Sequence, residues 1–218
     1  MAIINGNNSG NILWGTNNAD TINGNGGADL LFGRSGDDLI NGGNGNDILS
    51  GDSGNDTLNG DLGADLISGG SGDDQINGGD GNDALLGDSG NDTLIGGLGA
   101  DIFTGGSGAD IFKYLSASES LAPDRDWILD FKQGTDKIDL TGLGLVWSGS
   151  PALNGVWYEK VSGIDYVKAN INGADFQIRV SGLGGASINA DDFIGLGSGD
   201  VDEVAPAFTS GTTDTATE

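Results

Sequence analysis

A nine-residue period runs through the first half of this chain and constrains its fold more than any other feature. From residue 15 to residue 113 the sequence divides into eleven consecutive blocks without an insertion. Glycine holds the first position and aspartate the sixth position of every block, and the eighth position is always large and apolar. Glycine also holds the fourth position, except in the first block, where Asn18 stands. A degenerate block, 6–14, precedes them in the same register, with Asn11 in place of the aspartate.

Each position of the block predicts a local structure. Glycines at positions one and four permit the positive φ of a tight turn. The three residues after the aspartate form a short strand, with the eighth position pointing inward and the seventh and ninth outward. One block then makes one turn and one strand, and two blocks make one coil, with parallel strands and right-handed crossovers. We therefore predict an all-β fold for residues 6–113, a right-handed parallel β-roll whose core forms only when coils stack.

The aspartates predict what the roll binds. Stacking places the aspartates of alternate blocks in adjacent turns, where they repel one another unless a cation lies between them. Carboxylate and carbonyl oxygens suit calcium, which takes six to eight oxygen ligands, better than magnesium. Eleven blocks predict roughly nine calcium ions between the turns. The predicted ligands, together with backbone carbonyls of the glycine-rich turns, are Asp20, Asp29, Asp38, Asp47, Asp56, Asp65, Asp74, Asp83, Asp92, Asp101 and Asp110.

Composition excludes several other functions. The chain has 33 acidic and 8 basic residues, and it has neither histidine nor cysteine. Histidine- or cysteine-dependent nucleophiles and ordinary zinc sites are therefore excluded. The net charge of −25 argues against nucleic acid as a partner, and no apolar stretch predicts membrane insertion. The opening MAIINGNNSG lacks the basic and apolar regions of a signal peptide, so we expect export without a cleaved N-terminal signal.

The blocks match the nonapeptide GGxGxDxUx, and the sequence resembles the RTX family of secreted hemolysins, serralysin-type proteases, lipases and mannuronan epimerases. The resemblance implies that the array binds calcium outside the cell and that a bacterial type I system exports the chain unfolded, to the medium or the cell surface. After the repeats, PDRDWILDFKQGTDKIDLTGLG resembles the region that follows the repeats in RTX proteases and epimerases. Where relatives often carry a D-x-D-G-D-G loop, this chain has Asn-Ile-Asn-Gly at 170–173. The resemblance covers about residues 6 to 197.

Residues 114–197 predict a β-rich C-terminal cap. Strands are expected at 156–161, 164–171 and 175–180, because Ser-Gly and Asn-Gly pairs between them are typical of hairpin turns. The open last coil of a solenoid needs a cap, so capping is the predicted role, and a separate ligand-binding role is the alternative. Trp127, Leu129 and Phe131 are expected on one face of a further strand.

Residues 198–218 are acidic and rich in small residues, which predicts a flexible linker or tail leading to further domains of a longer parent chain.

The two outer faces of the roll are predicted to differ. One face carries an apolar stripe, which should not stay wet. We expect the C-terminal segment to cover it, with a partner or self-association as the alternative. The other face carries a polar asparagine ladder, interpreted as ordinary stacking or as a flat surface for polysaccharide or ice. The stripe consists of Ile12, Trp14, Leu30, Phe32, Ile48, Leu66, Ala84 and Ile102, and the ladder of Asn23, Asn41, Asn59 and Asn77.

Three functions follow from these patterns. The leading hypothesis is a non-catalytic extracellular calcium-binding module whose folding is driven by calcium after export. The alternative is a calcium-dependent polysaccharide-binding module similar to the repeat modules of mannuronan epimerases. The third is an enzyme that hydrolyses glycosides with paired carboxylates from Asp124, Asp126, Glu159 and Asp165. Because the chain has no HExxH, GxSxG or phosphate-binding loop, we expect no catalysis.

Overall fold

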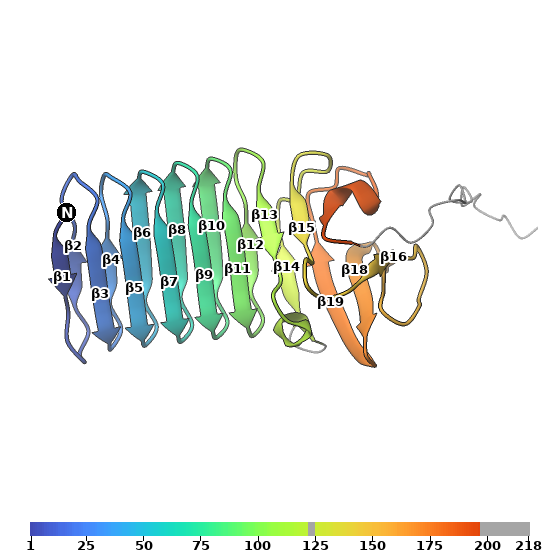
Figure 1. The fold of residues 1–218 in the computed structure, drawn as a ribbon, viewed down its shortest axis with the longest axis horizontal. Coiled ribbons are helices and arrows are strands. Elements are labelled where there is room, and N and C mark those ends of the chain that lie inside the picture. The colour runs from blue at the N-terminus through green and yellow to red at the C-terminus, as the bar shows by residue number, and fades with distance from the viewer. Residues whose placement is uncertain (122–124, 197–218) are drawn as a thin grey trace, which may run out of the picture.

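The computed structural model describes residues 1–121 and 125–196, and the predicted linker at 198–218 lies outside them. The described chain is an elongated stack of β-coils that leads from the N-terminus to a more irregular C-terminal end (Figure 1). Two short 3₁₀ helices, Ala117–Ser120 and Ala190–Asp192, interrupt the β structure near that end. Among the described residues no helix has the length and apolar character needed to span a membrane.

The first sheet takes one strand from each coil. Its nine strands lie in the order β1-β3-β5-β7-β9-β11-β13-β15-β20, and all pairs between them are parallel. Ile22 pairs with Ile40, and Ile40 with Leu58, so the register advances by two blocks per coil as predicted. The strands are β1 (Ile3–Asn5), β3 (Thr21–Gly26), β5 (Leu39–Asn44), β7 (Thr57–Leu62), β9 (Gln75–Asp80), β11 (Thr93–Leu98), β13 (Ile111–Lys113), β15 (Lys137–Asp139) and β20 (Phe193–Ile194).

The second sheet takes the other strand of each coil and then continues into the C-terminal region. Its eleven strands lie in the order β16-β17-β18-β19-β14-β12-β10-β8-β6-β4-β2. Leu31 pairs with Leu49 in parallel, again two blocks apart. The strands are β2 (Ile12–Trp14), β4 (Leu30–Phe32), β6 (Ile48–Ser53), β8 (Leu66–Ser71), β10 (Ala84–Ser89), β12 (Ile102–Thr104), β14 (Asp126–Ile128), β16 (Val146–Trp147), β17 (Gly155–Val161), β18 (Ile164–Ile171) and β19 (Ala174–Val180).

The core is a column of eighth-position side chains between the two sheets. Each is at most 1% exposed, and burying one leucine or isoleucine contributes about 1.5–3 kcal/mol relative to leaving it in water. No single coil could bury its own residue, so stability depends on neighbours above and below. The column consists of Ile22, Leu31, Ile40, Leu49, Leu58, Ile67, Ile76, Leu85, Leu94, Phe103 and Phe112.

Close stacking also explains the glycine at position four. Gly63, for example, has φ +137°, and a Cβ there would collide with the carbonyl oxygen of Gly45 in the preceding coil. Any other residue would be unfavourable for two reasons, because its backbone would have a positive φ and its Cβ would clash with the preceding coil.

Both sheets continue past residue 113, where the nine-residue period ends. β14 pairs in parallel with β12, and β15 with β13. The predicted antiparallel strands are confirmed as β17, β18 and β19, and β19 joins β14 in parallel, so this unit extends the second sheet along the axis of the stack. The division into three domains at residues 113 and 197 stays a prediction.

The prediction that the C-terminal segment covers the apolar stripe was wrong. Ile12 is 62% exposed, and Ile48, Leu66 and Ile102 are 41–44% exposed. The C-terminal segment stacks on the end of the solenoid because its strands pair with the last coil, and it therefore does not fold back over an outer face.

The alternation expected for Trp127, Leu129 and Phe131 was wrong for Phe131. Phe131 is fully buried, whereas Leu129 is exposed and Trp127 half-buried. β14 ends at Ile128, and the chain turns before Phe131, which enters the core.

The asparagine ladder forms on the outer face of the first sheet. Side-chain amides of Asn23, Asn41 and Asn59 each donate to the asparagine of the preceding coil at 2.8–2.9 Å, beginning with Asn5. The stacking interpretation accounts for these bonds, because identical amides one coil apart satisfy each other.

The buried column predicts a large difference between two leucines of strand β7. Leu58→Ala removes a fully buried side chain and should lower the free energy of unfolding by about 2–5 kcal/mol. Leu62 is 49% exposed, and Leu62→Ala should change it by no more than about 0.5 kcal/mol. Urea unfolding in saturating calcium measures both. Equal losses in the two variants would contradict the assignment of the core.

Candidate metal centre

The sixth-position aspartates form two continuous rows along the stack. All eleven are at most 3% exposed. The backbone N–H of each aspartate donates to Oδ1 of the aspartate in the next coil, at 2.7–3.1 Å over the nine such bonds. The turns therefore hold every carboxylate in the same orientation, because each is fixed by the backbone of its neighbour.

The other carboxylate oxygen of these rows is left without a partner. Oδ2 of ten of the eleven sixth-position aspartates is buried and accepts no hydrogen bond, and the same holds for Asp126. A buried charged oxygen with no protein partner is costly, and a repeated one is typical of a site that binds cations. The ten are Asp29, Asp38, Asp47, Asp56, Asp65, Asp74, Asp83, Asp92, Asp101 and Asp110.

In seven of these ten blocks the orphaned oxygen and a carbonyl oxygen of the next coil converge on the glycine at position one. A Cβ built on Gly42, at position one, would lie 2.6 Å from Asp47 Oδ2 of its own block and 2.9 Å from the carbonyl oxygen of Gly60 in the next coil. Similar convergence occurs at Gly24, Gly51 and Gly78. These are hard oxygen donors, the donor set of calcium. Across the described residues no three acidic side chains come together, so backbone carbonyls would supply most of the ligands.

Burial also makes the ionised aspartates unfavourable. Removal from water, with a contribution from neighbouring carboxylates, raises the pKa of Asp74 to about 7. A bound cation would reverse this effect by favouring the charged form. The pKa is raised to about 6 for Asp38, Asp65, Asp83, Asp92 and Asp101.

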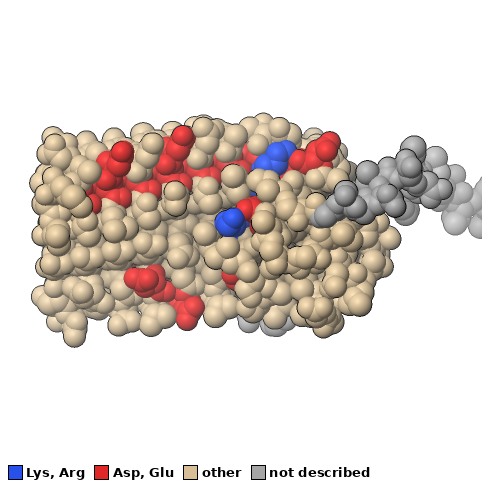
Figure 2. Space-filling model, viewed as in Figure 1, with Lys and Arg blue, Asp and Glu red and all other residues tan. Residues whose placement is uncertain are grey.

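Acidic side chains also lie along the edges of the roll where the turns are. On the face shown in Figure 2 they follow these edges, and the strand surface between them is largely uncharged. The negative potential is thus concentrated at the turns, where a cation would enter.

Two further aspartates continue the rows, and neither was among the eleven ligands predicted from the sequence. Asp101 N donates to Asp126 Oδ1 at 2.9 Å, and Asp110 N donates to Asp136 Oδ1 at 3.2 Å. Residues 131–139 keep glycine at the fourth position, aspartate at the sixth and isoleucine at the eighth, a signal that could have found Asp136. Seventeen residues, 114–130, separate this block from the end of the array, and because 17 is not a multiple of nine the period is hidden.

Three of the four carboxylates considered for catalysis have other contacts in the structure. Asp126 is buried in the aspartate row, and Asp124 lies outside the described residues. Glu159 pairs with Lys168 at 2.7 Å, and Asp165 with Lys160 at 3.0 Å.

A second feature lies on the outer face of the second sheet, where it meets the C-terminal strands. Arg125, Asp126, Trp127, Tyr166 and Arg179 line a hollow of about 330 Å³. The Arg179 guanidinium lies 3.7 Å from the centre of the Trp127 ring, and that of Arg125 lies 5.5 Å from the centre of the Tyr166 ring. Arg179 Nε is buried and has no hydrogen-bond partner among the described residues. This combination suits a ligand with a carboxylate and an apolar face.

Comparison with known proteins gives consistent matches. Residues 15–194 match the family described as Peptidase M10 serralysin C terminal. The solution structure of the AlgE6R3 subunit of mannuronan C5-epimerase from Azotobacter vinelandii is 32% identical, and the match covers 72% of this chain and 93% of that chain with a TM-score of 0.50. The AlgE6R2 subunit of the same enzyme is 31% identical, with 62% and 95% coverage and a TM-score of 0.48. Extracellular lipase LipA from Serratia marcescens is 18% identical, with 84% and 40% coverage and a TM-score of 0.33. A search of curated protein sequences gives no significant match.

The raised pKa values predict how the metal-free chain responds to pH. An aspartate in the unfolded chain has a pKa of about 3.9. At pH values between that pKa and the raised pKa values, the folded roll therefore binds more protons than the unfolded chain. Its stability should therefore rise as the pH falls from 7.5 to 5. Far-UV circular dichroism in metal-free buffer should show more β structure at pH 5. The calcium-saturated chain should show the opposite trend, because protons compete with calcium. A metal-free β signal that falls on acidification would contradict the burial argument.

Proposed function

The chain belongs to the family of serralysin C-terminal regions, and from this membership we propose that it is a non-catalytic, extracellular calcium-binding β-roll whose folding is driven by calcium after export. The family comprises RTX β-roll domains of secreted proteins. The observation that carries the proposal is the set of ten buried Oδ2 atoms without a partner. Calcium is the cation that the oxygen donors favour.

The ligands of each ion would be sixth-position carboxylates and turn carbonyls from two adjacent coils. Bound calcium supplies the positive charge that these turns lack. Residues 15–113 contain 17 aspartates but only Arg34 and Lys113 as basic residues. Without cations, the same stacking that buries the apolar column would bring these negative charges together, and repulsion would oppose it.

Linkage then couples binding to folding. The sites exist only between stacked coils, so calcium binds the folded chain and not the unfolded one. One site at a free calcium concentration of 100 times its Kd raises the free energy of unfolding by about 2.7 kcal/mol, and the contributions of several sites add together. The chain would stay unfolded at the low calcium concentration of a cytosol and fold outside the cell.

A second candidate function is binding of an acidic polysaccharide, and the hollow between Trp127 and Tyr166 favours it. Two guanidinium groups beside two aromatic rings suit a uronic acid, whose carboxylate and ring face they would contact. The AlgE6R3 subunit comes from an enzyme named for mannuronan, a polymer of this chemistry. Both functions can coexist, because the hollow lies on an outer face and the eleven sixth-position aspartates lie in the turns. Asp126 belongs both to a row and to the lining of the hollow.

The leading proposal predicts a cooperative transition from coil to β structure when calcium is added to metal-free protein. Magnesium at the same concentration should not produce it, and the midpoint should lie near the ~10⁻⁴–10⁻³ M of extracellular calcium modules. Asp65→Asn should raise the midpoint, because Asp65 is buried in a row. Asp61→Asn, in the same block but exposed, should not. Far-UV circular dichroism measures this, and a full β spectrum in excess chelator would refute calcium-driven folding.

The second candidate predicts retention on immobilised alginate in calcium but not on a neutral glucan. Arg179→Ala should reduce retention at least several-fold, since one charge-assisted contact is worth about 1.5–3 kcal/mol. Arg34→Ala is the matched control, because Arg34 also stacks on a tryptophan, Trp14, at 5.4 Å but lies outside the hollow. Equal retention of both variants and the unaltered protein would exclude the hollow as the binding site.

A further inference from the structure

The turns of the roll occur in two conformations. In all ten blocks from residue 24 to residue 113, positions two and four both have positive φ. We call these open turns. They belong to the same ten blocks whose aspartate Oδ2 has no partner. The position-two residues are Asn25, Arg34, Gly43, Asp52, Asp61, Gly70, Gly79, Asp88, Gly97 and Gly106, with φ between 69° and 110°.

Four other turns are closed by a hydrogen bond of their own. In three of them the N–H at position two donates to the side-chain oxygen at position six. In the fourth, which precedes β14, Leu115 N donates to Glu119, while Asp126 continues the aspartate row and its Oδ2 has no partner. None of the four donor residues has a positive φ. All four lie outside the ten open blocks, two before them and two after. The bonds are Asn7 N to Asn11 Oδ1 and Thr16 N to Asp20 Oδ2 at 2.7 Å, Lys132 N to Asp136 Oδ2 at 2.7 Å, and Leu115 N to Glu119 Oε2 at 2.9 Å.

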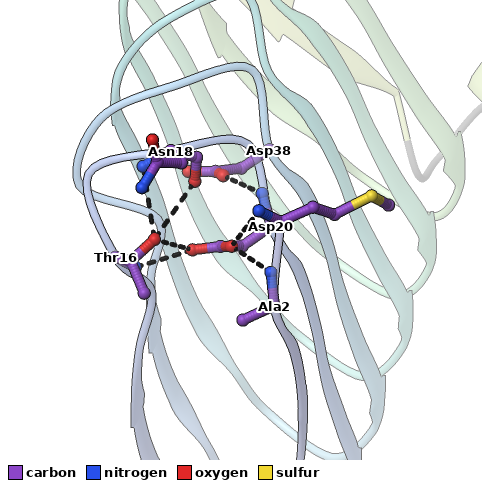
Figure 3. Close-up of polar contacts among 6 residues, drawn as sticks. Ala2, Thr16, Asn18, Asp20 and Asp38 are labelled. Carbon is purple, nitrogen blue, oxygen red and sulfur yellow. Dashed lines mark hydrogen bonds and ion pairs between the residues drawn. The ribbon is translucent and has the colours of Figure 1, made fainter.

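The turn at Asp20 shows what closure does to the carboxylate (Figure 3). Oδ2 accepts from both the N–H and the Oγ1 of Thr16 at 2.7 Å, and Oδ1 accepts from Ala2 N. Asp20 is therefore as buried as the other aspartates but has no oxygen left over. Hydrogen bonds from Thr16 hold the pKa of Asp20 below its usual value, opposite to the interior of the row.

The turn at Asp136 is closed in the same way at the other end. Its Oδ1 accepts from Asp110 N at 3.2 Å and its Oδ2 from Lys132 N at 2.7 Å. The ammonium group of Lys132 donates to the carbonyl oxygen of Gly106, at position two of the last open turn. A positive charge of the protein itself thus lies beside the end of the array.

The residue at position two helps to set the conformation. Glycine, asparagine and aspartate adopt the left-handed region most readily, and nine of the ten open turns have one of these three at position two, Arg34 being the exception. Thr16 is β-branched and strongly disfavours that region. In the closed turn, where Thr16 does not have a positive φ, its N–H reaches the carboxylate and occupies the oxygen that a cation would need.

We propose that closed turns end the cation array on both sides, so that the ions lie only between open turns and Asp20 takes none. This inference rests on the proposed calcium function. The open turns form two rows of five, and each row has four facing pairs. The array should therefore hold about eight ions rather than the roughly nine expected from eleven blocks.

Calcium stoichiometry of the full chain, by equilibrium dialysis and native mass spectrometry, tests the inference. Thr16→Gly/Asn18→Gly should open the first turn, which then faces the open turn of block 33, and the count should rise by one. Asp61→Thr should close a turn that faces open turns on both sides, and up to two ions should be lost. Asp61→Asn is the matched control, because it removes the same charge but tolerates positive φ, and its count should equal that of the unaltered chain.

The outcomes separate this inference from the function on which it rests. If the unaltered chain binds no calcium, both are refuted. If it binds calcium but the double glycine variant keeps the same count, the closure rule is refuted and calcium binding stands. Circular dichroism in saturating calcium shows whether Asp61→Thr folds, and if it does not, the double glycine variant decides the question by itself.

Discussion

The hydrogen bond from each aspartate N–H to the carboxylate of the next coil determines most of this structure. It fixes one oxygen of every carboxylate to the neighbouring backbone, at 2.7–3.1 Å, and directs the other into a space that protein donors do not reach. In an isolated coil the same carboxylate would be hydrated. Stacking removes the water, so the need for a cation arises from the same contacts that build the sheets.

The apolar column and the aspartate rows both depend on the stacking of the coils. Leucine and isoleucine at position eight are buried only when coils stack, and stacking also buries the aspartate two residues before each of them. The free energy gained by burying the apolar side chains opposes the cost of burying the carboxylates, and a bound divalent ion would remove that cost. Partially folded states of such a chain should be unstable, because a coil without neighbours has neither a core nor a complete site.

The ends of the roll differ from its interior, because the periodic structure has to terminate there. In the row that runs from Asp20 to Asp136, the turns at both ends change to a form in which the backbone satisfies the carboxylate, through Thr16 at one end and Lys132 at the other. The C-terminal strands then extend both sheets along the axis and finish in antiparallel hairpins. The apolar stripe on the second sheet stays exposed as a result, since the segment that follows the roll stacks on its end.

The sequence by itself determined the parallel roll, its register of two blocks per coil, the inward column and the two rows of stacked aspartates, because each of these repeats every nine residues. The tertiary structure decided the rest. Asp126 and Asp136 join the rows across separations of 25 and 26 residues, where an insertion breaks the period. Open and closed turns differ in backbone φ and in contacts with a neighbouring coil. The position of the C-terminal region depends on which strand edges are free to pair. These features depend on contacts between coils, and the pattern of repeats in the sequence does not specify those contacts.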